Sequence, residues 1–385
     1  MKKILFPIVF IVLFLHCSEN EYDSDNNQYY GEREISFPQT EIAGNKQATI
    51  QHVRSINIKE IINYVGEFWK LLVYNNLLFI SDWISVDIKV YKSTGELVRT
   101  IGKKGAGPGE FIDVRGGIAI QNDTLFVIDP ALRRLNIFHI DGSYIRSFPL
   151  PSPVNYAGTR GELYAINDTI IMPIIENRYS PMIEYHLSHT ISFLDKHGNI
   201  LQLFGSHPHE YTVFNMYMPN LSIAIDEDNN IYQLSRESPV IHKYNSSGEL
   251  IKIFGVVVDD YKPVYFNYSP DMPIPEIIRL SKKRSYATNL CWLPSQPHTF
   301  SSEQSKGYIV HTYDNLTEEG LTKSDPLLYD RYLQVYTDNG IYIPSNIPIN
   351  GLLLASDGEG FLYILTDNTP GNITIDIFAL HIEDE

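Results

Sequence analysis

The stretch GKKGAGPGEFIDVRGGIAIQNDTLFVIDPALRRLNIFHIDGSYIRSF runs from Gly102 to Phe148. It decides whether the chain contains a phosphate-binding loop or a connection between two β-structural units. Its first ten residues hold four glycines and two lysines, a composition that phosphate-binding loops share. Such a loop needs a helix after it and a Ser or Thr directly after a Gly-Lys pair. Here an alternating, strand-like run follows, and the Ser or Thr is missing. We therefore expect residues 102–111 to connect two β-structural units, with Phe111 buried between them.

A strand–turn–strand pattern recurs along the chain, and each turn ends in glycine. The segments are VYKSTGELVRTIG (90–102), IFHIDGSYIRSF (137–148), SFLDKHGNILQLFG (192–205) and HKYNSSGELIKIFG (242–255). Their turn glycines Gly95, Gly142, Gly198 and Gly248 are 47, 56 and 50 residues apart, and the next equivalent, Gly340, follows 92 residues later. Glycine at this place in a tight hairpin predicts a positive φ.

A second strand–turn–strand piece precedes each of these segments, as in GIAIQNDTLFVID (117–129) and SIAIDEDNNIYQLS (222–235). Together the two pieces form a four-stranded unit of about 45–55 residues, which is the period of a β-propeller blade. We place six units at 69–102, 115–148, 161–205, 220–255, 286–343 and 351–382. A seventh blade within 256–300 is the alternative, although residues 273–286 favour a short helix after Pro275.

The last unit shows only three strands, and the chain offers a fourth from its other end. The segment QATIQHVRSINI (47–58) has the strand pattern and precedes the first blade. A blade built from both ends of the chain closes the ring and leaves no open sheet edge between first and last blade. We predict an all-β, six-bladed propeller of four-stranded blades over residues 47–385, closed by this N-terminal strand.

The Gly102–Phe148 stretch resembles an NHL repeat along almost its whole length: a Gly-rich run with PGEF, then GIAI, a turn, LFVID, an Arg-bearing strand and a DG hairpin. Over residues 69–382 the chain resembles the six-bladed propeller lipoproteins of gut-type Gram-negative bacteria. Most members of that family have no assigned biochemistry. The resemblance implies the propeller fold and a place in the cell envelope.

The N-terminus, MKKILFPIVFIVLFLHC, begins with two lysines and continues with an apolar run, Ile4 to Leu15. That run is too short to span a bilayer, which takes about 20 residues, and it is typical of a signal peptide. Residues 1–16 are therefore predicted to be removed. Ending on Cys17 resembles a bacterial lipoprotein signal, so we expect Cys17 to be lipidated and residues 17–46 to form a flexible acidic tether to the outer membrane, on the periplasmic side or at the surface. A plain secretory signal is the alternative.

The formal charge is −16, and loss of two lysines with residues 1–16 would leave −18. Such a charge repels phosphate backbones and anionic lipid, so we expect no nucleic-acid partner and no membrane contact beyond the anchor. Once Cys17 is lipidated, Cys291 has no cysteine to pair with and is expected to be a buried apolar residue. We expect no cofactor.

Ligands of propellers commonly bind over the central channel, on the face that carries the blade-to-blade crossovers and the loops between second and third strands. The side chains expected nearest to the channel there are Asp82, Trp83, Arg115, Asp129, Arg133, Arg160, Arg236, Asn220 and Asn350. A guanidinium there would bind a carboxylate or phosphate through two hydrogen bonds. Alternatively, Arg115 and Arg133 pair with Asp82 or Asp129 as braces between blades.

Histidines on two predicted neighbouring loops raise a metal hypothesis. EYHLSHT contains His186 and His189, and HPHEY contains His207, His209 and Glu210. Three such nitrogens suit zinc, and the resemblance to NHL repeats supplies a fold-level precedent, because NHL-like amidating lyases hold a histidine-bound metal over the channel. Pro208 between two of the histidines fixes no ligand geometry, and exposed loop histidines without metal are commoner.

Two functions follow from these patterns. The leading one is a non-catalytic binding or scaffold module of the cell envelope, which recognises a protein, peptide or glycan through the loop face of the propeller. It is favoured because no assembled catalytic motif appears in the sequence. The alternative is a metal-dependent lyase or hydrolase with its site over the channel.

Overall fold

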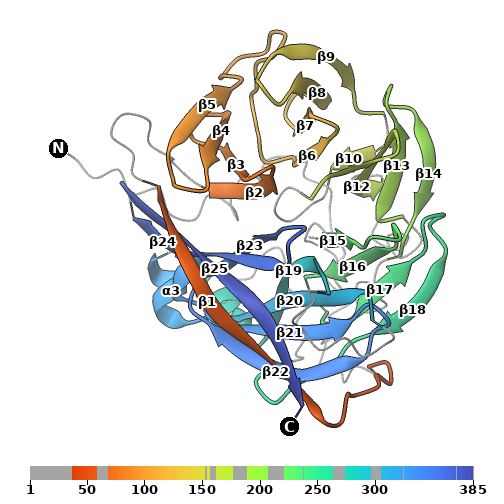
Figure 1. Cartoon of the computed structure of the whole chain (residues 1–385), viewed down its shortest axis with the longest axis vertical. Helices are drawn as coiled ribbons and strands as arrows, with labels where there is room; N and C mark the ends of the chain where they lie inside the picture. The colour runs from red at the N-terminus through yellow and green to blue at the C-terminus, as the bar shows by residue number, and fades with distance from the viewer. Residues whose placement is uncertain are drawn as a thin grey trace, which may run out of the picture.

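Six antiparallel sheets surround a common centre in a computed structural model of the chain, as Figure 1 shows. The structure describes residues 37–58, 68–151, 154–156, 162–176, 189–206, 221–236, 238–262, 274–295, 305–323, 325–369 and 371–384. Each sheet is one propeller blade. The predicted six-bladed, all-β propeller is therefore confirmed, and the alternative of a seventh blade is wrong.

The first three blades follow one another along the chain. Blade 1 contains β2 (Phe68–Tyr74), β3 (Leu77–Asp82), β4 (Asp87–Lys92) and β5 (Leu97–Ile101). Blade 2 contains β6 (Ile118–Gln121), β7 (Thr124–Asp129), β8 (Arg134–His139) and β9 (Tyr144–Pro149). Blade 3 contains β10 (Val154–Tyr156), β11 (Tyr164–Ile166), β12 (Thr169–Glu176), β13 (Ile191–Asp195) and β14 (Ile200–Phe204). In blade 3, β10 and β11 both pair with β12, so the inner strand has two pieces.

Blades 4 and 5 follow, and the described helices lie in connections of blade 5. Blade 4 contains β15 (Leu221–Ile225), β16 (Ile231–Ser235), β17 (Ile241–Tyr244) and β18 (Leu250–Phe254). Blade 5 contains β19 (Ser285–Pro294), β20 (Gly307–Asn315), β21 (Asp330–Thr337) and β22 (Tyr342–Ile349). The helix α2 (Ile274–Ser281) precedes β19, and α3 (Glu318–Lys323) and the 3₁₀ turn η3 (Pro326–Leu328) join β20 to β21. The short helix expected within 273–286 is thus present.

Blade 6 is built from both ends of the chain. It contains β23 (Leu352–Ser356), β24 (Phe361–Thr369), β25 (Asn372–Asp384) and β1 (Lys46–Ile58), in the order β1-β25-β24-β23. β1 and β25 run side by side in Figure 1 and pair from Lys46 with Asp384 to Ile58 with Ile373. The predicted closing strand is confirmed, and its backbone pairing covers the edge that β25 would otherwise present.

The chain already contacts the propeller before β1. The Thr40 hydroxyl donates to the Gly255 carbonyl at 2.8 Å. The Tyr342 N–H donates to the Glu41 carbonyl at 2.8 Å, and the Ala43 N–H donates to the Tyr342 carbonyl at 2.9 Å. The end of the segment predicted as a tether therefore lies against blades 4 and 5. Residues 1–36, with the predicted signal peptide and Cys17, lie outside the described residues.

The hydrophobic core is divided among the six contacts between neighbouring blades. Each buried cluster draws its side chains from two adjacent sheets, for example Ile88 and Val90 of blade 1 with Leu125 and Val127 of blade 2. The other five clusters join the remaining pairs of neighbours, including blades 6 and 1. Removing apolar surface from water between blades stabilises the ring as a whole.

The turn glycines hold neighbouring blades together. The five predicted ones all have positive φ, between 75° and 97°. A Cβ added to Gly198 of blade 3 would lie 2.3 Å from the ring of Phe148, at the end of the outer strand of blade 2. Gly248 stands in the same relation to Phe204, and Gly340 to Phe254. The outer strands of blades 2, 3 and 4 therefore each end in a phenylalanine that packs against the turn glycine of the next blade, where a side chain would clash.

The Gly-rich run 102–111 is the crossover from blade 1 to blade 2. Its N–H groups bind within the loop: Gly105 N–H donates to the Phe111 carbonyl at 2.9 Å, and Gly107 N–H donates to the Glu110 carboxylate at 2.8 Å. The Arg134 guanidinium donates to three carbonyls of the loop. Phe111 is fully buried between the two blades, as expected. These internal bonds account for the composition that resembles a phosphate-binding loop.

Candidate functional site

The antiparallel strand order assigns every connection to one of two faces. Connections between second and third strands, and crossovers from one blade to the next, share one face, which we call the loop face. The two helices described, α2 and α3, both belong to these connections in blade 5. Hairpins between first and second strands and between third and fourth strands form the opposite, hairpin face. Several candidate site residues from the sequence fall within the described part of the chain, and all of these belong to the loop face.

Asp82 lies at the end of β3 and is fully buried. Its carboxylate accepts hydrogen bonds from the N–H groups of Ile84 at 3.0 Å and Ser85 at 3.2 Å, which fixes the turn to β4. It also binds the buried ammonium of Lys89 at 2.7 Å. Burial by itself would lower the pKa of Lys89, but hydrogen bonds to Asp82 and Asp87 raise it above the usual value. This aspartate serves the turn and its buried ion pair.

Asp129 occupies the equivalent position in blade 2 and is also fully buried. It accepts from the Leu132 N–H at 2.9 Å and from the Ile112 N–H of the crossover at 2.8 Å. The carboxylate thereby joins its own turn to the loop entering the blade. Arg133 in this turn is exposed, with φ of 48°, and its carbonyl accepts from the Leu150 N–H at 2.7 Å.

Trp83 and Arg115 meet where blades 1 and 2 adjoin. The guanidinium carbon of Arg115 lies 5.0 Å from the centre of the indole ring, a distance typical of cation–π contact. Arg115 also binds both carboxylate oxygens of Asp113, with Nε–Oδ1 and Nη2–Oδ2 distances of 2.9 Å. A carboxylate that holds Arg115 is thus that of Asp113, two residues earlier in the crossover.

Arg236 lies directly after β16, at the boundary between blades 4 and 5. Its carbonyl accepts a hydrogen bond from the Ala287 N–H of β19 at 2.9 Å, and this bond links the end of β16 in blade 4 to the inner strand of blade 5. Its guanidinium carbon lies 4.6 Å from the ring centre of Tyr286. A second guanidinium, that of Arg284, lies 4.3 Å from the same ring. Two arginines therefore share one buried tyrosine at the start of an inner strand.

The sequence interpretation missed Arg284 and Tyr286. Both lie in SKKRSY (281–286), and the run of three basic residues in an acidic chain was the available signal.

Asn350 is exposed at the crossover between blades 5 and 6. Arg160, Asn220 and three histidines of the metal hypothesis, His186, His207 and His209, lie outside the described residues. Among the residues that are described, no group of three His, Cys, Asp or Glu side chains could hold a metal ion.

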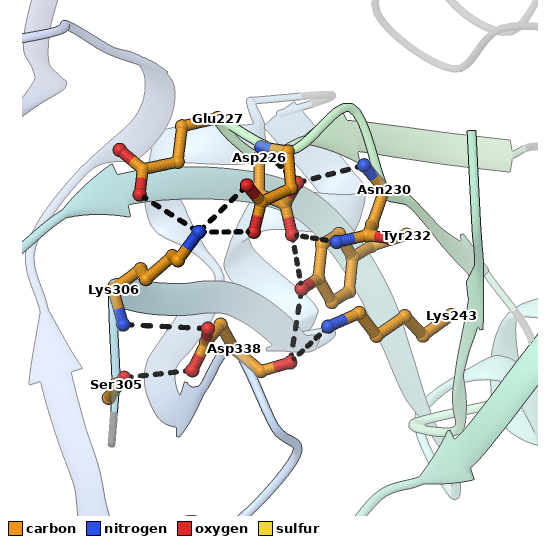
Figure 2. Close-up of polar contacts among 9 residues, drawn as sticks. Asp226, Glu227, Asn230, Tyr232, Lys243, Ser305, Lys306 and Asp338 are labelled. Carbon is orange, nitrogen blue, oxygen red and sulfur yellow. Dashed lines mark hydrogen bonds and ion pairs between the residues drawn. The ribbon is translucent and has the colours of Figure 1, made fainter.

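A polar cluster on the hairpin face joins blades 4 and 5, and Figure 2 shows its members. The Tyr232 hydroxyl lies 2.9 Å from the Asp226 carboxylate and 3.0 Å from the Asp338 carbonyl. Lys243 donates to that carbonyl at 2.9 Å. The half-exposed Lys306 pairs with Asp228 at 2.7 Å. The acidic triplet 226–228 thus serves a turn and a contact between blades.

Comparison with known proteins supports the fold. A family model described as a 6-bladed beta-propeller, DUF5128, matches residues 61–165. No curated protein matches the chain. No helix in the described part of the chain is long and apolar enough to cross a membrane.

Two solved structures from Bacteroides have similar architecture. A member of the DUF4221 family from Bacteroides vulgatus superimposes with a TM-score of 0.66 at 12% identity, over 88% of this chain and 99% of that one. A Bacteroides fragilis protein, described as a candidate exported protein, superimposes with a TM-score of 0.51 at 13% identity, over 90% and 98% of the two chains. At these identities the likeness establishes the shared fold.

Proposed function

We propose that this chain is a non-catalytic binding module of the cell envelope, which recognises a protein, peptide or glycan through its loop face. The observation that carries the proposal is the pairing of arginine with aromatic rings there, Arg115 on Trp83 and Arg236 on Tyr286. Arginine and large aromatic side chains dominate the energy of recognition surfaces because they combine apolar area with directed hydrogen bonds. Loops on a rigid scaffold are the usual place for such surfaces.

The acidic residues of the same face support binding over catalysis. Asp82 and Asp129 are buried and accept backbone N–H groups, so their contacts hold loops in place. A general acid or base has to reach a substrate proton. In this proposal the two aspartates position the loops, and the partly exposed side chains of Trp83, Arg115 and Arg236 contact the ligand.

The proposed location is the cell envelope, with the chain anchored to the outer membrane through lipid on Cys17. The supporting features are the apolar N-terminal run that ends on this cysteine and the similarity to a protein described as a candidate for export. Growth with a labelled fatty acid tests the anchor. Label should enter the wild-type chain and be absent from Cys17→Ser. Equal labelling of both chains would contradict lipidation at this residue.

Affinity capture from gently solubilised envelopes tests the binding function. We expect a partner or glycan that is enriched with the wild-type chain and lost with Arg236→Ala or Trp83→Ala. Lys306→Ala is the matched control, because it removes a half-exposed cation from the hairpin face. A partner retained equally by all four chains would contradict the loop-face assignment. Recovery of the chain without any partner would contradict the binding module as proposed.

A further inference from the structure

A cavity of about 150 Å³ lies on the hairpin face of the propeller, at the boundary between blades 5 and 6. Its lining comes from three parts of the chain. Blade 5 supplies residues of the hairpin 337–343, blade 6 supplies Ile382 of β25, and the entry into β1 supplies Glu41, Ala43 and Lys46. The shape of the cavity therefore depends on how the chain enters its closing strand.

The chain passes from one blade to the next at this cavity. Ile42 forms a parallel bridge with Tyr342 of β22, the outer strand of blade 5. Lys46 then begins the pairing of β1 with β25 in blade 6. The turn between them is closed by the Lys46 N–H, which donates to the Ala43 carbonyl at 3.2 Å. Figure 1 shows this turn beside β22 and the C-terminal end of β25. Backbone pairing on both sides thus fixes the outer wall of the cavity.

The inner wall of the cavity is apolar. Ile343 and Ile382 are 1% and 3% exposed, and both belong to the buried cluster between blades 5 and 6. Ala43 packs against the same cluster, and the partly buried Ile341 completes this apolar wall. An aliphatic group of a ligand would lose its contact with water here, which favours binding.

Two opposite charges also line the cavity. Glu41 is exposed and Lys46 is half-buried. Within the described part of the chain, neither side chain forms an ion pair with the other or with a third group. Asp384, which lies opposite Lys46 in the register of β1 and β25, is itself exposed. One carboxylate and one ammonium are therefore available to a ligand.

Thr337 adds a neutral donor to the same lining. It is 7% exposed, and its hydroxyl oxygen accepts a hydrogen bond from the Ile341 N–H at 3.1 Å. Among the described residues the hydrogen of this hydroxyl has no acceptor, so it can donate to a group in the cavity. A hydroxyl and an ammonium together suit a carboxylate, and the carboxylate of Glu41 suits an ammonium.

The volume limits the size of the ligand. A cavity of about 150 Å³ holds a molecule as large as benzene, whereas sites for drug-sized ligands measure about 300–1,000 Å³. A free amino acid with a small aliphatic side chain, such as valine, matches this size. It carries an ammonium and a carboxylate on one carbon atom and places an apolar group beside them. A dipeptide is too large for the cavity.

We propose that this cavity binds a free amino acid with a small aliphatic side chain. The ammonium of the ligand pairs with Glu41, its carboxylate contacts Lys46 and the Thr337 hydroxyl, and its side chain lies against the apolar wall. The site is separate from the loop face and goes beyond the binding function proposed there. Because Glu41 and Lys46 lie between the predicted tether and β1, the ligand also links the entry of the chain to blade 5.

Titration of the lipid-free chain, residues 17–385 with Cys17→Ser, tests the site. Valine is added at constant ionic strength, and binding is followed by NMR of 13C-labelled isoleucine methyl groups. We expect saturable shifts at the isoleucines of the apolar wall, with a Kd of about 1 mM or tighter. Isobutylamine and isovalerate, which each lack one charge, should bind at least about tenfold more weakly. The dipeptide Val-Val should not compete with valine.

Two variants test the charges that the ligand is expected to contact. Glu41→Gln and Lys46→Gln should each weaken valine binding at least about tenfold, because each leaves one charge of the ligand unpaired. Lys92→Gln is the matched control, because it removes an exposed cation from blade 1, and its affinity should equal that of the wild-type chain.

Three results would overturn the inference. They are the absence of saturable shifts at the apolar wall, affinity unchanged in both charge variants, and binding of isovalerate or isobutylamine as tight as that of valine. Envelope capture tests the loop face by a separate readout, so failure of this site leaves the proposed binding function standing.

Discussion

At the residue scale, the turn glycines Gly198, Gly248 and Gly340 have little freedom to change, because an added Cβ would lie within 2.9 Å of a phenylalanine ring or of another side chain. Gly198→Ala would place a methyl group 2.3 Å from the Phe148 ring, at a φ of 86°. Both the close approach and the left-handed backbone oppose a side chain, so we expect unfolding free energy to fall by at least about 2 kcal/mol. Urea denaturation followed by circular dichroism measures the change. Gly358→Ala is the control, since its added Cβ would meet nothing within 4 Å, and equal losses in both variants would contradict the blade-contact role.

Two buried histidines make stability depend on pH. Burial lowers the pKa of His242 and of His311 from 6.5 to about 4. Both are neutral in the folded state, so their contribution is complete above pH 6.5 and is lost as pH falls toward 4. One pKa unit corresponds to about 1.4 kcal/mol, and we expect about 2 kcal/mol per histidine to be lost between pH 7.5 and 5. Urea unfolding at the two pH values tests this, and His242→Gln should show a smaller loss. An equal loss in that variant would exclude His242 as a source.

At the element scale, the contact between blades 4 and 5 depends on a buried hydroxyl (Figure 2). Burial and the Asp226 carboxylate raise the pKa of Tyr232 far above its usual range, so the group remains a donor. Tyr232→Phe removes that donor while the Asp226 turn persists, and we expect a loss of about 1–3 kcal/mol. Thermal unfolding measures it. Tyr144→Phe, which removes an exposed hydroxyl bonded to Ser147, should change stability little. Similar losses in both variants would argue against the buried contact.

The blades themselves could be predicted because each local signal repeats. Gly95, Gly142, Gly198 and Gly248 mark hairpins at a nearly constant spacing, so one recognised unit supports the next. The broken inner strand of blade 3 follows from no such signal, since β10 and β11 are three residues each. Nor did the sequence indicate α3, because the segment between β20 and β21 that contains it has no repeated counterpart in the other blades.

The candidate site was less predictable than the blades, for a physical reason. The position of a residue at a strand end follows from the repeat, but its partner depends on the packing of other segments. Asp82 and Asp129 were expected near the channel, and in the structure their carboxylates accept N–H groups of adjoining turns. Arg284 comes close to Arg236 only because β19 begins beside the end of β16. Arg284 follows Arg236 by 48 residues along the chain, so no local sequence pattern indicates that the two side chains lie close together.

At the scale of the whole molecule, the ring depends on a strand contributed by the opposite end of the chain. Ile56 and Ile58 of β1 are buried between blades 6 and 1, and Ala48 is buried between blades 5 and 6. Burying one isoleucine is worth about 1.5–3 kcal/mol, so two of them account for at least about 3 kcal/mol. Without β1, β25 also becomes an open edge that favours aggregation.

Two truncations separate this role from that of the preceding chain. A protein of residues 37–385 retains β1 and should unfold cooperatively as a monomer. A protein of residues 59–385 should lose at least about 3 kcal/mol and aggregate, because one blade lacks its outer strand. Calorimetry and size-exclusion chromatography compare the two. Added peptide 46–58 should restore the shorter protein by pairing with β25, and the same peptide with Ile56→Asp and Ile58→Asp should not. Equal stability of the two truncated proteins would show that the ring closes without β1 and would contradict this role of the strand.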